Sequence, residues 1–142
     1  MFSDTSISDD LLHAYRATDY HVEAAEPFVL RVGQASPDLL HLYAKYQCEC
    51  AAFLTACNPF SEITAEQENE FRQTELANEL RKRGLHFLNG IGRDTLGQWP
   101  GEPSFLVFNL SSESAERLGS EQNQNALIWC GPDAVPQLIL LR

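Results

Sequence analysis

Asn69 and Arg72 occupy positions where an amphipathic helix would normally place apolar side chains. The helix predicted after Asn58 carries an apolar stripe on Leu76 and Leu80. Stepping back along that stripe by three and four residues reaches Arg72 and Gln73, and then Asn69. The first turn of a helix also presents unpaired N–H groups and the positive end of the helix dipole. An amide and a guanidinium beside such an end could hold an anion or a carboxylate.

The same periodicity also permits an ordinary surface helix. If Phe71 and Ala77 faced the core, Asn69 and Arg72 would be solvated side chains with no binding role. The periodicity does not decide between these two interpretations.

Glu102 stands two residues before an apolar run, residues 104–110, that predicts a buried strand. Binding residues cluster where strands end, so a carboxylate at this position is well placed for function. A half-buried carboxylate without a partner would have a raised pKa and could act as a general base. Glu102 is therefore a weak catalytic candidate, and an ion pair with Arg72 is the structural alternative. The sequence leaves open whether the protein is an enzyme.

Two side-chain amides complete the predicted site. Asn58 ends the apolar run at residues 50–56, and Gln124 precedes the strand predicted at residues 125–130. Amides can read the polar edge of a ligand, but they also form turns and helix caps. Trp99 could be a lid or a packed loop residue. The predicted ligand-binding residues are Asn58, Asn69, Arg72, Glu102 and Gln124.

Helical and strand-like patterns predict the elements that position these residues. Helices are expected over residues 8–20, 36–46, 64–83 and 111–121, the third with a capping box starting at Thr64. Strands are expected over residues 28–32, 50–56, 85–88, 104–110, 125–130 and 135–141, with a short extended piece at 21–24. The order favours an α+β single domain, with a mixed sheet of about five to six strands and helices packed over it. The first few residues are expected to be flexible.

Charge and composition restrict the partners. The 142 residues include 20 acidic and 10 basic ones, for a formal net charge of -10. This balance argues against binding to nucleic acid or to an anionic membrane. No apolar run has the length of a membrane span and no signal-peptide pattern begins the chain, so a cytoplasmic location is expected. The four cysteines are expected to be free thiols, and neither a metal nor a cofactor is predicted.

Two functions of different classes fit these observations. The first is a polar pocket for a small molecule, which could be nucleotide-like, with Arg72 on an anionic group and Glu102 on a cationic or donor group. The alternative is an acidic protein-interaction or regulatory module without catalysis, acting through the glutamates of residues 62–70 and 113–121. With either function, the protein could form a homo-oligomer.

A series of motifs runs along the chain: Tyr15-Arg16-Ala17-Thr18-Asp19-Tyr20, Phe53-Leu54-Thr55-Ala56-x-Asn58-Pro59, Asn69-x-x-Arg72, Gly90, Trp99-x-x-Glu102-x-Ser104 and Gln124-Asn125-Ala126. In these motifs the chain resembles a family of small bacterial proteins, domain-of-unknown-function family 3293. The resemblance covers nearly the whole chain and implies no known activity. The family usually has Trp where this sequence has Cys57.

About half of the chain follows the order of a helix with Asn and Arg, a glycine loop, a Glu before a buried strand, a short helix and a Gln before a strand. In this order the chain has a weaker similarity to phage-type S-adenosylmethionine lyases. The resemblance implies that Glu102 lies in a ligand pocket and that subunits form trimers. Shared architecture does not fix function, so lyase activity itself is not expected.

Overall fold

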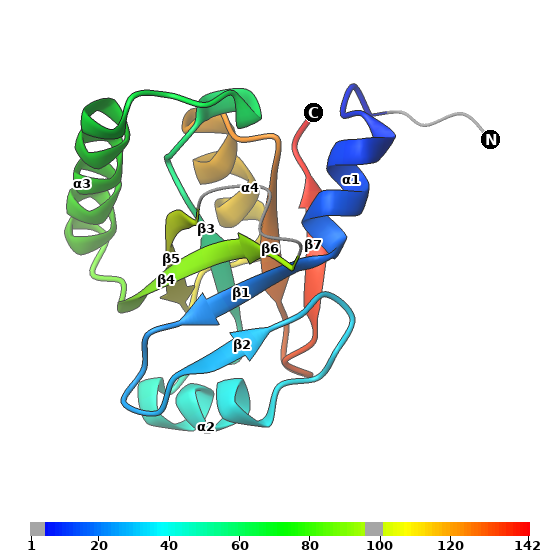
Figure 1. Cartoon of the computed structure of the whole chain (residues 1–142). Coiled ribbons are helices and arrows are strands. Elements are labelled where there is room, and N and C mark those ends of the chain that lie inside the picture. Colours follow the sequence, from blue (N-terminus) through cyan, green and yellow to red (C-terminus); the bar gives the residue numbers. More distant parts are fainter. Residues whose placement is uncertain (1–4, 96–100) are drawn as a thin grey trace.

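A computed structural model describes residues 5–95 and 101–142 (Figure 1). The elements are α1 (Asp9–Arg16), β1 (Thr18–Val22), β2 (Phe28–Leu30), α2 (Pro37–Tyr46), β3 (Ala51–Leu54), a short 3-10 turn (Pro59–Ser61), α3 (Glu66–Lys82), β4 (Phe87–Asp94), β5 (Glu102–Phe108), α4 (Ser112–Glu121), β6 (Ala126–Cys130) and β7 (Pro136–Leu140). None of these helices has both the length and the apolar character needed to cross a membrane.

One curled sheet contains every strand of the described chain, in the order β2-β1-β4-β5-β3-β6-β7. The predicted α+β class and the packing of helices over a sheet are confirmed. Two details differ from the prediction: the sheet has seven strands, and all six pairings are antiparallel rather than mixed.

The additional strand is β1, whose first half was predicted to be the end of the first helix. Helix α1 ends at Ala17, and the Thr18 hydroxyl donates a hydrogen bond to the Ala14 carbonyl at 2.6 Å. From Thr18 onward the backbone pairs with β4 and, from Tyr20, also with β2. Pairing on both sides therefore overrides the weak helical pattern of this short segment.

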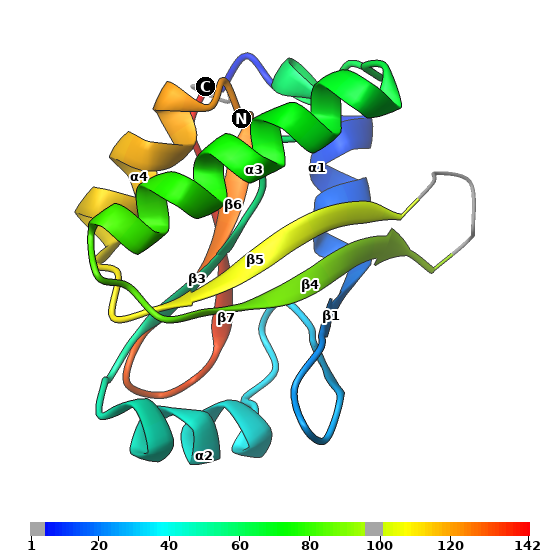
Figure 2. The same cartoon turned by 90° about the vertical axis from the view of Figure 1, so that its left-hand side faces the viewer.

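The two faces of the sheet carry separate apolar cores. Helices α3 and α4 cover one face, where Leu76, Leu80 and Leu118 pack against the strands. Helix α2 covers part of the other face, and Figure 2 shows it on the side away from α3 and α4. All four residues of β3 are buried because this strand lies in the sheet between β5 and β6 and is covered on both faces. The unbroken apolar run at residues 50–56 reflects this central position.

Successive residues of β5 alternate between these two cores. Leu106 and Phe108 belong to the core under α2, while Phe105 and Val107 face α3 and α4. Continuing the alternation backwards places Ser104 and Glu102 on the α2 face. They lie beyond the part of that face that α2 covers, so the fold brings two polar side chains to an otherwise apolar surface.

Candidate functional site

A cavity of about 170 Å³ lies between helix α1 and the face of the sheet that carries Glu102 and Ser104. Its walls are mostly apolar and aromatic. Its polar groups come from six separate segments of the chain: α1, β1, the turn after β3, the end of β4, strand β5 and the residues just before β6. The lining includes Leu11, Tyr15, Tyr20, Phe53, Asn58, Ser61, Asp94, Glu102, Ser104, Gln124, Asn125, Ile128 and Leu138.

Two asparagines join the turn after β3 to the first turn of α3. The Asn58 backbone N–H donates to Asn69 Oδ1 at 2.9 Å, and Asn69 Nδ2 donates to Asn58 Oδ1 at 2.9 Å. Asn58 Oδ1 also accepts the backbone N–H of Thr64 at 2.9 Å. Asn58 has a φ of 47°, in the left-handed region that asparagine tolerates better than most residues. Both amides therefore fix the path of the chain around this turn.

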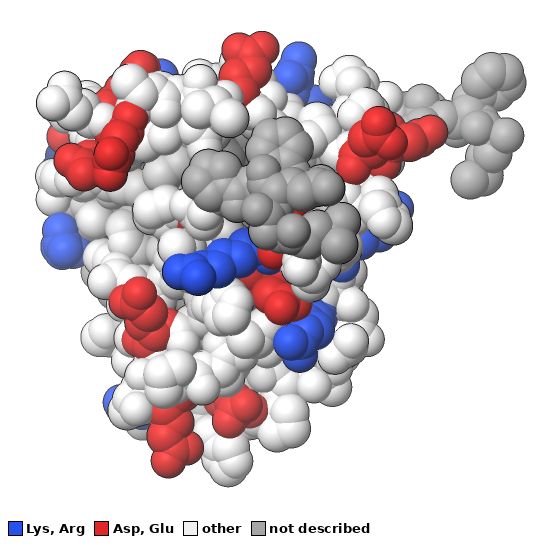
Figure 3. Space-filling view, viewed as in Figure 1, with Lys and Arg blue, Asp and Glu red and all other residues white. Residues whose placement is uncertain are grey.

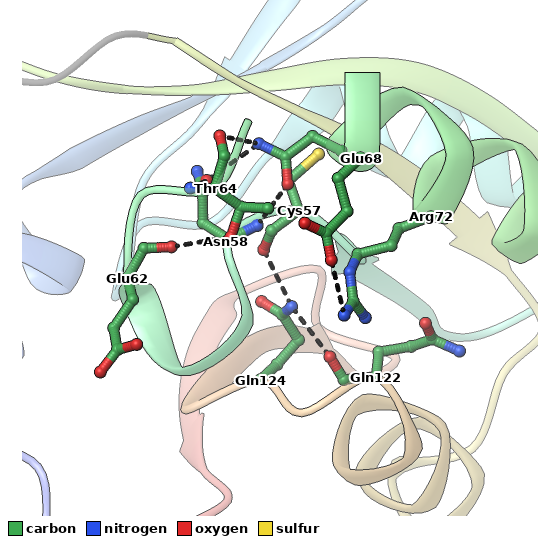
Figure 4. A network of polar contacts seen from close by, with 9 residues as sticks. Cys57, Asn58, Glu62, Thr64, Glu68, Arg72, Gln122 and Gln124 are labelled. Atoms are coloured by element: carbon green, nitrogen blue, oxygen red, sulfur yellow. Dashed lines mark hydrogen bonds and ion pairs between the residues drawn. The ribbon is translucent and has the colours of Figure 1, made fainter. Parts of the chain in front are cut away.

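This asparagine pair replaces the capping box predicted at Thr64, and that prediction is wrong. Helix α3 begins at Glu66, and its N-cap residue, Ala65, makes no side-chain cap. The Thr64 hydroxyl donates to the Glu62 carbonyl instead of capping the helix (Figure 4). Asn58 binds the Thr64 N–H, and Asn69 Nδ2 donates to the Thr64 carbonyl at 3.3 Å. Tertiary hydrogen bonds thus hold Thr64 outside the helix.

Glu102 lies half-buried in the cavity wall with Asn58 as its hydrogen-bond partner. Asn58 Nδ2 donates to Glu102 Oε2 at 2.9 Å. Burial raises the pKa of the Glu102 carboxyl because the charged form loses hydration, and the bond from Asn58 opposes that rise. The carboxylate is thus oriented by one amide and faces a largely apolar space.

Gln73 was not among the predicted site residues, although it lies on the polar continuation of the apolar stripe. It is buried, and its Oε1 accepts the Ala56 backbone N–H at 2.7 Å and the Thr55 hydroxyl at 3.2 Å. Phe71 is 65% exposed, so the helix does not turn that residue inward. A polar residue on the core side of α3 therefore secures the end of β3.

Arg72 does not line the cavity, so the five predicted residues do not all converge on one pocket. Its guanidinium forms an ion pair of 3.3 Å with Glu68, one turn back on the same helix. Figure 4 shows this pair beside the amide network. Within the described ranges the ion pairs do not include the Arg72–Glu102 pair considered as an alternative. The Arg72 Nε atom is buried without a partner among the described residues.

Gln124 lines the cavity and also holds the turn from the opposite side. Its Nε2 donates to the Cys57 carbonyl at 3.0 Å and to the Gln122 carbonyl at 3.2 Å. Of the predicted set, Asn58, Glu102 and Gln124 reach the cavity, while Asn69 supports Asn58 from behind.

A second polar group ties α1 to the mouth of the cavity. The Tyr15 hydroxyl shares a hydrogen bond with Ser61 Oγ, and Asn125 Nδ2 donates to both oxygens, at 3.2 Å and 3.1 Å. Arg142 donates to Asn125 Oδ1 at 3.1 Å. The sequence predictions did not place these residues in the site, because Tyr15 lies 46 positions before Ser61 and 110 positions before Asn125. Tyr15 and Asn125 appear only in the motifs of the family resemblance.

Among the described residues, the thiols and the charges on the face of Figure 3 do not form a second cluster. All four cysteines are free, and burial raises the pKa of the Cys57 thiol, which keeps it protonated. No group of three or more metal-ligating side chains occurs among residues 5–95 and 101–142. On the face shown in Figure 3, acidic side chains are scattered among basic and uncharged ones instead of forming one patch. Trp99, predicted as a lid or a packed residue, lies outside the described residues.

The model of the family "Protein of unknown function (DUF3293)" matches residues 54–127, more than half of the chain. The chain belongs to this family. The matched segment contains all five predicted site residues and the β4–β5 pair, whereas α1 and β7 lie outside it. No curated protein and no solved structure matches the chain. The similarity to S-adenosylmethionine lyases therefore stays a prediction.

Proposed function

We propose that this protein binds a small organic molecule in the cavity between α1 and the sheet. The observation that carries the proposal is the Glu102 carboxylate, which lies in an apolar cavity wall and is oriented by Asn58. A buried carboxylate costs folding free energy unless it is paired. A carboxylate in the wall of a space large enough for a ligand is typical of a binding site.

The cavity combines features of small-molecule sites. Such sites are concave and mostly apolar, with a few fixed polar groups that set orientation. Here the polar groups are held in place by their neighbours: Asn69 holds Asn58, which in turn orients Glu102. This preorganisation lowers the entropic cost of binding.

A cavity-filling substitution tests the proposal directly. Ser104 is 4% exposed and lines the cavity, and its hydroxyl donates only to the backbone carbonyl of Glu102 within the described chain. Ser104→Leu should fill the cavity, whereas Ser104→Ala should leave it open. In a thermal-shift screen of small metabolites, we expect at least one compound to stabilise the wild type and Ser104→Ala, but not Ser104→Leu.

Two results would contradict this function. One is a broad screen in which no compound stabilises the wild type. The other is a compound that stabilises Ser104→Leu as much as the wild type, since its site would then lie elsewhere. Circular dichroism and urea unfolding of both variants would show that the fold is kept.

A further inference from the structure

The charge of the cavity lining has one sign. Asp94 and Glu102 both line it, and no Lys, Arg or His occurs among the described lining residues. The cation that the sequence assigned to an anionic ligand group, Arg72, lies outside the cavity and pairs with Glu68. An anionic ligand at Glu102 would therefore meet a carboxylate, with no cation among the described lining residues to offset the repulsion, at a cost that grows as water is excluded.

Glu102 can accept a hydrogen bond from a ligand, and its orientation is fixed. A carboxylate has about four acceptor positions on two oxygens, and Asn58 donates to only one of them, Oε2. The Asn58 amide cannot be reversed without loss, because its Oδ1 accepts from the Thr64 N–H and from Asn69 Nδ2. Its NH₂ group must therefore face Glu102, and the carboxylate, which lines the cavity, keeps acceptor positions for a ligand.

Aromatic rings form the walls near this carboxylate. Tyr20 and Phe53 both line the cavity and meet edge to face, with ring centroids 5.2 Å apart. Aromatic faces attract cations, and the attraction grows when the cation is desolvated. The volume of about 170 Å³ is close to the roughly 150 Å³ of a cavity known to hold benzene. The space thus suits a body about the size of one ring.

From this geometry we infer the class of ligand, an inference that rests on the proposed function: the cavity binds a small organic cation. Its ammonium or amidinium group donates to Glu102, and its apolar body, about the size of one ring, packs against Tyr20 and Phe53. This assignment reverses the polarity of the sequence-based prediction, in which Arg72 held an anionic group.

Three probes with the same ring and different charge test the inference by isothermal titration calorimetry. Benzylamine carries a cation, benzyl alcohol is neutral and benzoate is an anion. A charge-assisted hydrogen bond adds about 1.5–3 kcal/mol, so benzylamine should bind about 10- to 100-fold more tightly than benzyl alcohol. Benzoate should bind more weakly than either. Glu102→Gln should remove most of the preference for benzylamine, with Asp94 left as the remaining carboxylate of the lining, and should change the affinity for benzyl alcohol much less.

Glu68→Gln is the matched control, since it removes the same charge from a residue outside the cavity. It should keep the preference for benzylamine. Equal loss of preference in Glu68→Gln and Glu102→Gln would overturn the inference, because the preference would then reflect net charge alone. A preference for benzoate, or binding by none of the three probes, would also overturn it.

These outcomes separate the ligand class from the proposed function. If benzoate or benzyl alcohol binds best and Ser104→Leu blocks it, the cavity is a binding site and only the inferred cation is wrong. If none of the three binds, the broad metabolite screen with Ser104→Leu still decides the proposed function independently.

Discussion

The face of the sheet under α1 and α2 has one packed end and one hollow end, built on the same strand. Along β5, Leu106 and Phe108 fill the end under α2, where Tyr46 stacks on Phe108 with ring centroids 4.3 Å apart. Toward the other end the same face carries Ser104 and Glu102, which line the cavity. A change of residue type at alternate positions of one strand therefore separates a core from a candidate binding site.

The two ends also differ in electrostatics. Backbone strain does not separate them, because positive φ occurs at Asn58, Phe60 and Ser61 in the turn at the hollow end and also at Gln47 and Ala134 beside the packed end. The hollow end, however, carries a carboxylate whose pKa is raised by burial. Departures from local rules gather at functional sites in natural proteins, so this carboxylate supports the choice of the hollow end.

The largest expected effect lies at the packed end. Phe108→Ala removes a ring that is 1% exposed, and we expect it to lower the free energy of unfolding by about 3–5 kcal/mol. Leu138→Ala at the hollow end should cost only about 1 kcal/mol, because that side chain is half-buried and already faces the cavity. Urea denaturation of both variants measures the difference. Equal losses would mean that the cavity end is packed like the core.

Removing Asn58 should have the next largest effect. Asn58→Gly accepts the left-handed backbone but leaves the Thr64 N–H, Asn69 Nδ2 and the Glu102 carboxylate without their partner. We expect a loss of about 2 kcal/mol. Asn58→Ala should lose about 1 kcal/mol more, since alanine disfavours this φ. Urea unfolding gives both values, and identical losses would contradict a strained backbone at Asn58.

Glu102→Gln should change how stability depends on pH. The folded state holds the Glu102 proton more tightly than the unfolded chain, whose ordinary pKa is 4.5. The wild type therefore loses stability as the pH rises from 4.5 through the raised pKa, and then no further. Glutamine keeps an acceptor for Asn58 and does not ionise. The free energy of unfolding of the variant, relative to that of the wild type, should therefore rise over that pH interval.

Unfolding free energies of both proteins between pH 4 and pH 8 would measure this difference. The charge of Glu102 also affects the pKa values of Tyr20 and Cys57, but burial raises both of these pKa values, and both groups titrate above this pH interval. Asp94 is present in both proteins. A difference that does not vary with pH would show that the carboxyl titrates like an exposed one.

Arg72→Ala should have the smallest effect. The ion pair with Glu68 is partly exposed and spans one helical turn, so its loss should cost about 0.5 kcal/mol or less. Any ligand that stabilises the wild type should stabilise this variant equally, because Arg72 does not line the cavity. Thermal shifts with a bound compound would measure this. Loss of the shift in Arg72→Ala would show that Arg72 takes part in binding after all.

Local patterns predicted most of the framework. The serine caps at Ser8, Ser36 and Ser111 form as their sequence context indicates, each accepting a backbone N–H within its helix. The buried central strands were visible as unbroken apolar runs. The start of α3 was mispredicted because Asn58, six positions before Thr64, competes for the N–H that a cap would need.

The candidate site was only partly predictable, because its contacts are long-range. The bond between Asn58 and Glu102 spans 44 positions, and the one between Asn125 and Tyr15 spans 110. A helical or strand periodicity does not show which residues so far apart along the chain come into contact. Arg72 was misplaced for a local reason: the helical pattern gives its position around the helix axis, but not that its long side chain would turn back toward Glu68.

The central place of β3 also bears on how the chain is synthesised. Both of its partners, β5 and β6, are translated later, and pairing is complete only when Cys130 has been made. During translation the apolar residues of β3 therefore remain without their strand partners while some 50 to 80 further residues are added. Sheets that depend on such distant pairing fold slowly and expose aggregation-prone strands. We thus expect truncated nascent chains to depend on chaperones until β6 emerges from the ribosome.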